Sequence, residues 1–213
     1  MIIPPRFNGP PGSGNGGYSA GIFAGGAQCE VTLRMPPPLD TSLSMVDGQI
    51  YAPDGSVVAE VTPAREIDTV VAPVGYADAV RASTGYAGFA DHPFPTCYVC
   101  GPDRSDGLRI FPGPVSGNTT AAPWTVPVDV SPAMVWAALD CPGGWAVIAE
   151  GRPYVLGRIA VLLDRMPVPG DQCVVLGALA AAEGRKALVH TTLYGPDGAL
   201  LARARATWIA VVR

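Results

Sequence analysis

Two short phrases of this chain occur twice, in the same order. The phrase RMPPPLD at residues 34–40 returns as RMPVPGD at 165–171, and YAPDG at 51–55 returns as YGPDG at 194–198. The offsets are 131 and 143 residues, so the second copy holds 12 more residues between its two phrases. Solenoid repeats run at about 20 to 50 residues. The much longer period here predicts a divergent tandem duplication of one small folding unit.

The composition is unusually poor in charge. Charged residues make up 15% of the 213 residues, against about 25% in a typical protein. A chain this apolar is expected to hide surface in an oligomer or to line an apolar pocket. No window holds the 18 or so consecutive apolar residues that a membrane span needs, which predicts that the chain does not enter a membrane. The net charge of -4 and the lack of a basic cluster argue against nucleic acid as a partner.

The start of the sequence and its cysteines bear on the compartment. The first six residues, MIIPPR, lack the basic-then-apolar order of a signal peptide. Five cysteines, an odd number, do not resemble a secreted disulfide framework. Both observations favour the cytoplasm.

The first copy is predicted to contain a short helix and three strands. Small residues over 18–24 favour one or two helical turns, and the Asn15 side chain can accept from the first free backbone N–H groups as an N-cap. Runs with β-branched content, bounded by turn residues, predict strands at 28–34, 43–51 and 56–65. The Pro-Asp-Gly at 53–55 predicts a hairpin turn.

The second copy repeats this order. Ser131 followed by Pro132 predicts a helix start, because proline at the first helical position loses no hydrogen bond, and the helix is expected to reach about Ala149. Strands are expected at 154–163, 172–182, 186–194 and 200–212. Between the copies we expect a helix at 74–83 and a strand pair at 107–111 and 122–126. A helix followed by an antiparallel meander, twice over, predicts an α+β fold.

Three phrases resemble those of the hotdog-fold acyl-CoA thioesterases. CYVCGPD at 97–103, followed by GLRI at 107–110, is similar to the C-F-V-C-G-P-[DE] and G-L-[RK]-[LI] opening of PaaI-type members. AALDCPGGWA at 137–146 resembles their central-helix phrase A-L-L-D-x-x-x-G-W-A, and NGGY at 15–18 resembles the helix entry of the TesB-like double-hotdog branch. The resemblance covers roughly residues 8–65 and 94–212.

The resemblance implies a tandem, or double, hotdog, in which an antiparallel β-sheet wraps a central helix in each copy and acyl-CoA binds between the copies. The expected units are an N-terminal hotdog-like copy at 1–65, a connecting segment with the Cys-x-x-Cys knuckle at 66–106, and a C-terminal copy at 107–213. The first copy is the shorter, because 19 residues separate Asn15 from Arg34 whereas 34 separate Ser131 from Arg165.

The implied chemistry is thioester hydrolysis, with a carboxylate beside a polarised carbonyl. Asp140 aligns with the carboxylate of the helix phrase and stands in an apolar stretch, where desolvation raises a pKa toward a useful value. Its alternative role is a helix cap, because Pro142 follows. Asn15 with Gly16 and Gly17 would polarise the carbonyl at a helix start, and the alternative for Asn15 is an ordinary N-cap.

Other positions complete or weaken the resemblance. Tyr18 and Trp145 would line the acyl pocket, and Arg158 would bind a CoA phosphate. The His-Gly-Gly that opens the PaaI-type central helix is replaced by Ser131-Pro132-Ala133, and proline cannot donate a backbone N–H. The Thr and Gln of the TesB-like branch fall near Val155 and Ala206, so neither is retained.

Cys97 and Cys100 form a Cys-x-x-Cys pair, which is half of a zinc site. His92 and Cys141 would complete it only if folding brought them close, so we expect a structural knuckle without a metal, and no cofactor. His190, in a predicted strand, is expected to pack rather than to catalyse.

The sequence therefore predicts a protein that hydrolyses or binds acyl-CoA or another acyl thioester, with one composite site between the copies and a homodimer as a possible assembly. The alternatives are a non-catalytic acyl-binding or structural hotdog, and a zinc-knuckle interaction module.

Overall fold

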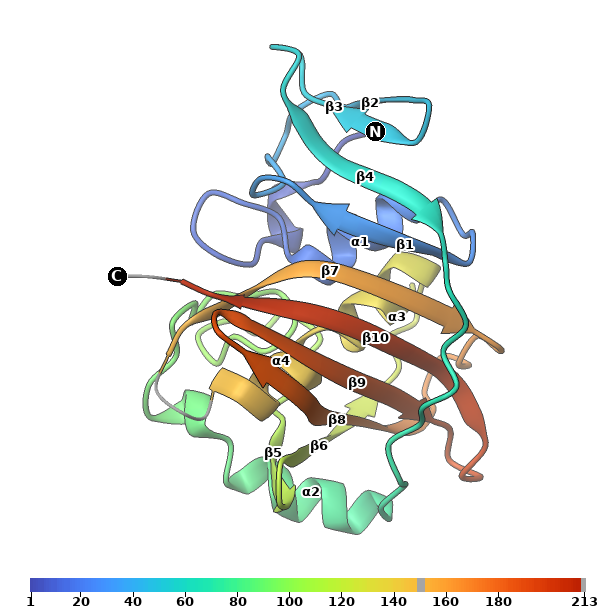
Figure 1. Cartoon of the computed structure of the whole chain (residues 1–213). Helices are drawn as coiled ribbons and strands as arrows, with labels where there is room; N and C mark the ends of the chain where they lie inside the picture. The colour runs from blue at the N-terminus through green and yellow to red at the C-terminus, as the bar shows by residue number, and fades with distance from the viewer. Residues whose placement is uncertain (149–151, 212–213) are drawn as a thin grey trace.

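The computed structural model describes residues 1–148 and 152–211. The first part of the chain holds one short helix and four strands (Figure 1). These elements are a 3-10 turn at Pro5–Phe7, α1 (Gly16–Ala24), β1 (Cys29–Leu33), β2 (Ser44–Val46), β3 (Gln49–Tyr51) and β4 (Val57–Pro63). The middle of the chain holds α2 (Tyr76–Thr84), a 3-10 turn at Ala87–Phe89, β5 (Gly113–Ser116) and β6 (Thr119–Thr125). The last part holds α3 (Pro132–Ala138), α4 (Cys141–Ile148), β7 (Tyr154–Leu163), β8 (Gln172–Glu183), β9 (Lys186–Tyr194) and β10 (Leu200–Ala210).

All ten strands belong to one antiparallel sheet, in the order β2-β3-β4-β1-β7-β10-β9-β8-β6-β5. The order from β2 to β8 is symmetric about the β1–β7 pair, where Val31 lies opposite Ile159, and β6 and β5 extend the β7 side only. On one side of this pair, the neighbours of β1 are β4, then β3, then β2. On the other side, the neighbours of β7 are β10, then β9, then β8. Each side is a single strand followed by a meander whose last strand pairs with that first strand, whereas the sequence predicts a simple meander directly after the helix.

The repeated phrases occupy corresponding connections on the two sides. The phrase at 34–40 follows β1 and the phrase at 165–171 follows β7. The second pair, at 51–55 and 194–198, makes the hairpin turns from β3 to β4 and from β9 to β10. Gly55 and Gly198 have φ values of 85° and 75°, a left-handed conformation that a side chain would strain.

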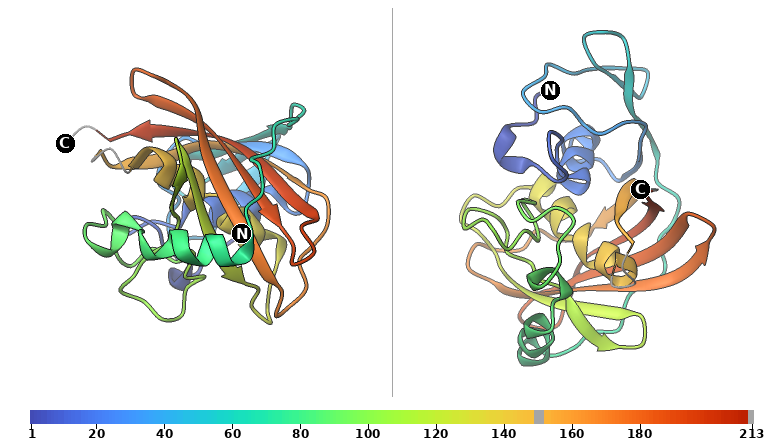
Figure 2. Two further views of the ribbon diagram at one scale, coloured as in Figure 1. Left: turned by 90° about the horizontal axis from the view of Figure 1, so that it is seen from below. Right: turned by 90° about the vertical axis from the view of Figure 1, so that its left-hand side faces the viewer.

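Helices α1, α3 and α4 lie against the concave side of the curved sheet, and α2 packs on its other face against Ala121, Val174 and Leu176 (Figure 2). Helix α1 crosses α3 closely, because small residues face the crossing. A Cβ atom added at Gly21 would lie 2.7 Å from the Ala133 Cα atom, and one added at Gly17 would lie 2.7 Å from the Trp136 carbonyl oxygen. The apolar face of the sheet and these helices share one large core that runs across the β1–β7 pair.

The predicted central helix is interrupted. The Ser131 side chain caps α3 by accepting from the Met134 N–H at 3.4 Å, as expected. Helix α3 ends at Ala138 and α4 begins at Cys141. Pro142 has no N–H and favours a first helical turn, so the chain restarts a helix there instead of continuing one. The predicted end of this helix, at Ala149, lies outside the described residues.

Two strand predictions were wrong. Residues 43–51 form a hairpin instead of one strand, because Asp47 and Gly48 adopt positive φ values that reverse the chain. Residues 107–111 form no strand, and β6 pairs instead with β5. Leu108 and Ile110 donate backbone hydrogen bonds to Tyr98 and Val99 and so hold this segment on the cysteine knuckle. The predicted strand end at Val212 lies outside the described residues.

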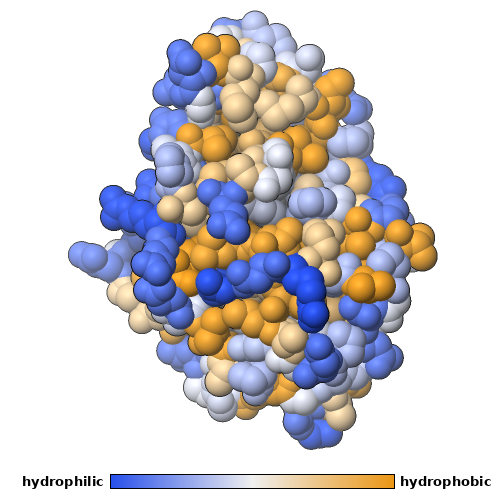
Figure 3. Space-filling view, turned by 90° about the vertical axis from the view of Figure 1, so that its right-hand side faces the viewer, coloured by the Kyte–Doolittle hydropathy of each residue, from blue (hydrophilic) through white to orange (hydrophobic). Residues whose placement is uncertain are grey.

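The segment that joins β4 to α2 descends along the outer face of the sheet (Figure 1). Arginines of β10 hold it there: Arg203 donates to the Ile67 carbonyl oxygen at 2.7 Å and Arg205 donates to that of Glu66 at 3.2 Å. Figure 3 shows this face, on which a polar band crosses a largely apolar surface. No helix in the described part of the chain is long and apolar enough to cross a membrane.

Candidate functional site

Asp140 stands at the break between α3 and α4 and is buried, with 2% of its surface exposed. Its carboxylate does not cap the helix that follows it. Oδ2 instead accepts the Gly17 backbone N–H at 3.0 Å and the Asn15 amide Nδ2 at 3.2 Å. Both donors belong to the start of α1, in the first part of the chain. The segments predicted to be the first and second copies therefore contact each other at this carboxylate.

The start of α1 is arranged around that contact. The Asn15 side chain accepts the Tyr18 backbone N–H at 2.8 Å, which confirms its predicted role as N-cap. With its Oδ1 atom so engaged, Asn15 directs Nδ2 toward Asp140. The Gly16 N–H has no hydrogen-bond partner within the described residues. Helix starts carry positive partial charge, so this end of α1 favours an anion.

The two oxygens of the carboxylate differ. Oδ2 accepts both hydrogen bonds, whereas the buried Oδ1 has no partner among the described residues. Burial raises the pKa of Asp140 to about 7, against the lowering effect of the Gly17 and Asn15 hydrogen bonds. Desolvation disfavours the charged form, and this outweighs the two donors.

A small cavity of about 50 Å³ lies at this carboxylate, and a groove of about 510 Å³ opens beside it. Asp140, Asn15 and Trp145 line the cavity. The groove is largely apolar, and its volume is in the range of small-molecule sites. The cavity and the groove share the wall residues Pro10, Gly16, Phe94, Val155 and Leu156.

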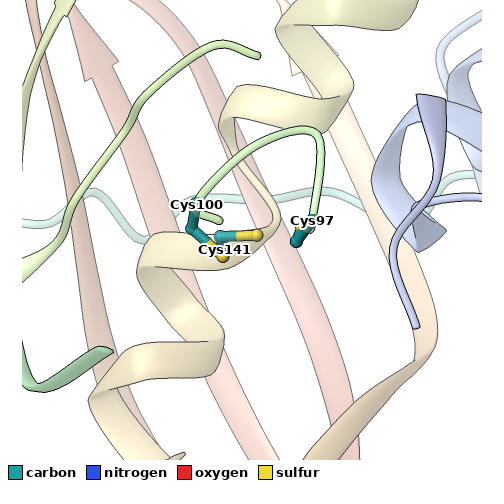
Figure 4. A group of neighbouring side chains, drawn as sticks. All are labelled: Cys97, Cys100 and Cys141. Atoms are coloured by element: carbon teal, nitrogen blue, oxygen red, sulfur yellow. The ribbon is translucent and has the colours of Figure 1, made fainter. Parts of the chain in front are cut away.

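Three cysteines form a second cluster on the same cavity wall. Cys97, Cys100 and Cys141 are buried, and their sulfur atoms lie within 4.8 Å of one another (Figure 4). The neighbouring thiols donate hydrogen bonds to the Cys97 sulfur, and this lowers the pKa of Cys97 well below its ordinary value. The Cys141 thiol is a donor in these hydrogen bonds, and this raises the pKa of Cys141 well above its ordinary value. Asn15 joins this cluster to the carboxylate, since its Nδ2 atom also lies 3.8 Å from the Cys97 sulfur.

The predicted site residues divide into two groups. The structure brings together Asp140, Asn15, Gly16, Gly17 and Trp145. Gly17 donates to Asp140, and Gly16 and Trp145 line the cavity.

Tyr18 and Arg158 lie elsewhere. The Tyr18 ring stacks on Phe7 at 3.7 Å between centroids, and Tyr18 is not among the residues that line the cavity or the groove, because it points to the other side of α1. Arg158, on β7, lies 3.3 Å from Glu30 and donates to Thr32 at 2.9 Å. Arg158 is not among the residues that line the groove or the cavity.

The sequence reasoning missed Arg34 as a groove residue and considered His92 only as a metal ligand. Arg34 belongs to the first repeated phrase and lines the groove, where it forms an ion pair with Glu60 at 2.5 Å. His92 lines the cavity, and its Nε2 atom lies 3.4 Å from the Cys100 sulfur. The location of Arg34 in a repeated phrase was a usable signal, since that phrase directly follows the strand that joins the two sides.

No family model matches the sequence, and no curated protein matches it. Among solved structures, a protein from Novosphingobium aromaticivorans that has been provisionally assigned as a thioesterase superposes with a TM-score of 0.62 and 16% identity, covering 100% of this chain and 94% of that one. The Escherichia coli PaaI protein of the phenylacetic acid degradation operon has a TM-score of 0.50 and 11% identity, covering 64% of this chain and 96% of that one. The chain therefore shares a hotdog-type fold with these two proteins.

Proposed function

We propose that this protein is an acyl-CoA thioesterase whose single active site lies between two hotdog copies in one chain. The observation that carries the proposal is the buried Asp140 carboxylate at the cavity wall. Its Oδ2 atom accepts two hydrogen bonds from the start of α1, and its Oδ1 atom has no hydrogen-bond partner among the described residues. Burying an oxygen atom that has no hydrogen-bond partner costs free energy of folding. Such an atom on the wall of a cavity is typical of a group that takes part in a reaction.

The proposed architecture is a tandem double hotdog that arose by duplication. Its support is the symmetric strand order about the β1–β7 pair, together with the repeated phrases in corresponding connections. On this proposal, residues 1–65 and 107–213 are the two copies and 66–106 connect them. The first copy is shorter in its strands, since β2 and β3 have three residues each whereas β8 and β9 have 12 and nine.

The proposed reaction is general-base hydrolysis. Asp140 Oδ1 accepts a proton from water, the water oxygen bonds to the thioester carbon, and the bond from that carbon to sulfur breaks. The departing thiolate takes the proton from Asp140, which leaves a carboxylic acid and a free thiol. Asn15 and Gly17 position the base, instead of polarising the carbonyl as expected, because both donate to Oδ2. The Gly16 N–H is the donor left for the oxyanion.

Hydrolysis is tested by measuring thiol release from a panel of acyl-CoAs, from acetyl to palmitoyl. We expect at least one to turn over well above the rate seen with the Asp140→Asn variant. No release above that variant from any member of the panel would reject the enzymatic proposal. Thermal shift with CoA and with acyl-CoA then separates a binder from a scaffold, because a ligand of the native state raises the melting temperature.

The groove residue Arg34 is proposed to contact a CoA phosphate. We expect Arg34→Ala to raise the KM for acyl-CoA about fivefold with little change in kcat, because a partly exposed contact between charges contributes about 1 kcal/mol. Arg158→Ala is the matched control. Arg158 has the same exposure, 48% against 49% for Arg34, and the same kind of ion pair, but it does not line the groove. Equal changes in KM for both variants would contradict this assignment.

One observation favours the alternative of a non-catalytic acyl-CoA-binding hotdog. The Asn15 and Gly17 donors, which the family resemblance assigns to the carbonyl, are both taken by Asp140. For this alternative, CoA raises the melting temperature and no acyl-CoA is hydrolysed.

A homodimer also stays a proposal. It is supported by the apolar surface of the face shown in Figure 3, and analytical ultracentrifugation measures the oligomeric state.

A further inference from the structure

Three of the five cysteines converge at one point of the fold, although Cys141 lies 41 residues after Cys100 in the chain. Cys97 and Cys100 belong to the turn of the connecting segment, and Cys141 is the first residue of α4. All three side chains are directed to the space between that turn and the helix (Figure 4). We propose that Cys97, Cys100 and Cys141 bind one zinc ion, which fastens the connecting segment to the break in the central helix beside the cavity.

The spacing of the sulfur atoms fits a tetrahedral metal site. Zinc binds cysteine sulfur at about 2.3 Å, so two sulfurs of a tetrahedral site lie about 3.8 Å apart. The three sulfurs here lie within 4.8 Å of one another. Closing them onto an ion needs movements on the order of 1 Å or less, which side-chain rotation can provide. The cysteine knuckle is rigid, because a Cβ added at Gly101 would lie 2.5 Å from the Cys97 backbone nitrogen.

The surroundings of the sulfurs are those of thiolates. The Trp145 indole Nε1–H donates to the Cys100 sulfur at 3.5 Å, and the Asn15 amide donates to the Cys97 sulfur at 3.8 Å. A thiol sulfur is a weak acceptor and needs no such set of donors. Donors of this kind stabilise the negative charge of metal-bound thiolates and orient them.

His92 is a donor to the cluster and not a ligand. Its Nδ1 atom accepts the Phe94 backbone N–H at 2.8 Å, so the ring proton resides on Nε2, which lies 3.4 Å from the Cys100 sulfur. The three thiolates leave one tetrahedral position for an oxygen ligand. Water from the cavity would supply that oxygen.

The chemistry of the cluster selects the metal. A soft set of three thiolates suits zinc and excludes magnesium and calcium, which prefer oxygen. Three thiolates and a divalent ion carry a net charge of -1, which the side-chain donors of Trp145, Asn15 and His92 offset in a buried site. This assignment reverses the sequence-based expectation of a knuckle without a metal, because folding brings Cys141 to the pair.

The test measures the zinc content of the full chain, purified without a polyhistidine tag from zinc-supplemented cells. We expect about one zinc per chain by mass spectrometry, and below about 0.2 for Cys97→Ser, Cys100→Ser and Cys141→Ser individually. Cys29→Ser and Cys173→Ser are the matched controls, because both residues are buried cysteines outside the cluster, and they should keep the full zinc content.

A measurement on the wild-type chain covers the case in which the serine variants do not fold. Cobalt added to metal-free protein should give the thiolate-to-metal absorption of a tetrahedral site, which saturates at about one equivalent. Zinc-free wild-type protein without this absorption, or a disulfide bond among the three cysteines, would overturn the proposal. Metal content is read without substrate, so this result is independent of acyl-CoA turnover.

Discussion

Replacing Asp140 with asparagine should abolish acyl-CoA hydrolysis and leave the protein folded. The amide keeps an acceptor oxygen for the Asn15 and Gly17 donors, which now hold Oδ2. It cannot accept a proton from water, so the base is lost. General-base catalysis contributes about 10²–10⁴-fold, and we expect kcat to fall by that factor. The melting temperature should stay the same or rise, because burying a neutral amide costs less than burying a carboxylate.

The measurement pairs kcat with the melting temperature for each variant. Asp47→Asn is the matched control, because Asp47 is exposed in the β2–β3 turn and its positive φ suits asparagine. It should leave both quantities unchanged. If Asp140→Asn retained more than about a tenth of kcat, the base would have to be another group. If it unfolded the protein, Asp140 would be a structural cap.

The second expected result concerns the crossing of α1 and α3. Gly17→Ala should destabilise the protein by about 1–3 kcal/mol, a typical cost of overpacking. The new Cβ would lie 2.5 Å from the Asp140 Cβ atom and 3.1 Å from the Ala137 Cα atom. Backbone atoms cannot move aside as the end of a side chain can, so the helices must separate. The same shift would displace the carboxylate, and kcat should fall as well.

Chemical and thermal unfolding measure the loss of stability. For a chain of this length we expect the melting temperature to fall by roughly 2–10 °C. Gly75→Ala is the matched control, because Gly75 precedes α2 and a Cβ there would meet only the Asp78 side chain, at 3.2 Å. That variant should lie within about 0.5 kcal/mol of the wild type. Equal stability of the Gly17→Ala and wild-type chains would show that α1 and α3 do not approach so closely.

Most of the regular elements could be predicted because their signals are local. The hydrophobic pattern with its turn residues placed β7, β8, β9 and β10 within a few residues, and the Asn15 and Ser131 caps were both identified. The strand prediction at 107–111 failed because that segment uses its hydrogen bonds on the cysteine knuckle, a contact that a strand pattern does not reveal. The 43–51 prediction failed because Asp47-Gly48 was not recognised as a turn.

The site shows the same division. Asp140, Asn15 and the following glycines were found from short phrases, but their roles depend on how the copies meet. The glycines were expected to polarise a carbonyl, and Gly17 instead donates to Asp140. Tyr18 was expected to line the acyl pocket, yet one step along a helix turns a side chain by about 100°, and the Tyr18 ring stacks on Phe7.

The repeated phrases, read alone, predict two related units with a helix and a meander in each, because turn and period signals depend on neighbours in sequence. How the units join is a matter of distant contacts. The β1–β7 pairing, the carboxylate of one unit on the helix start of the other, and the meeting of Cys141 with Cys97 and Cys100 all join residues far apart in the chain. Such contacts are selected by packing across the whole core, and no local pattern encodes them.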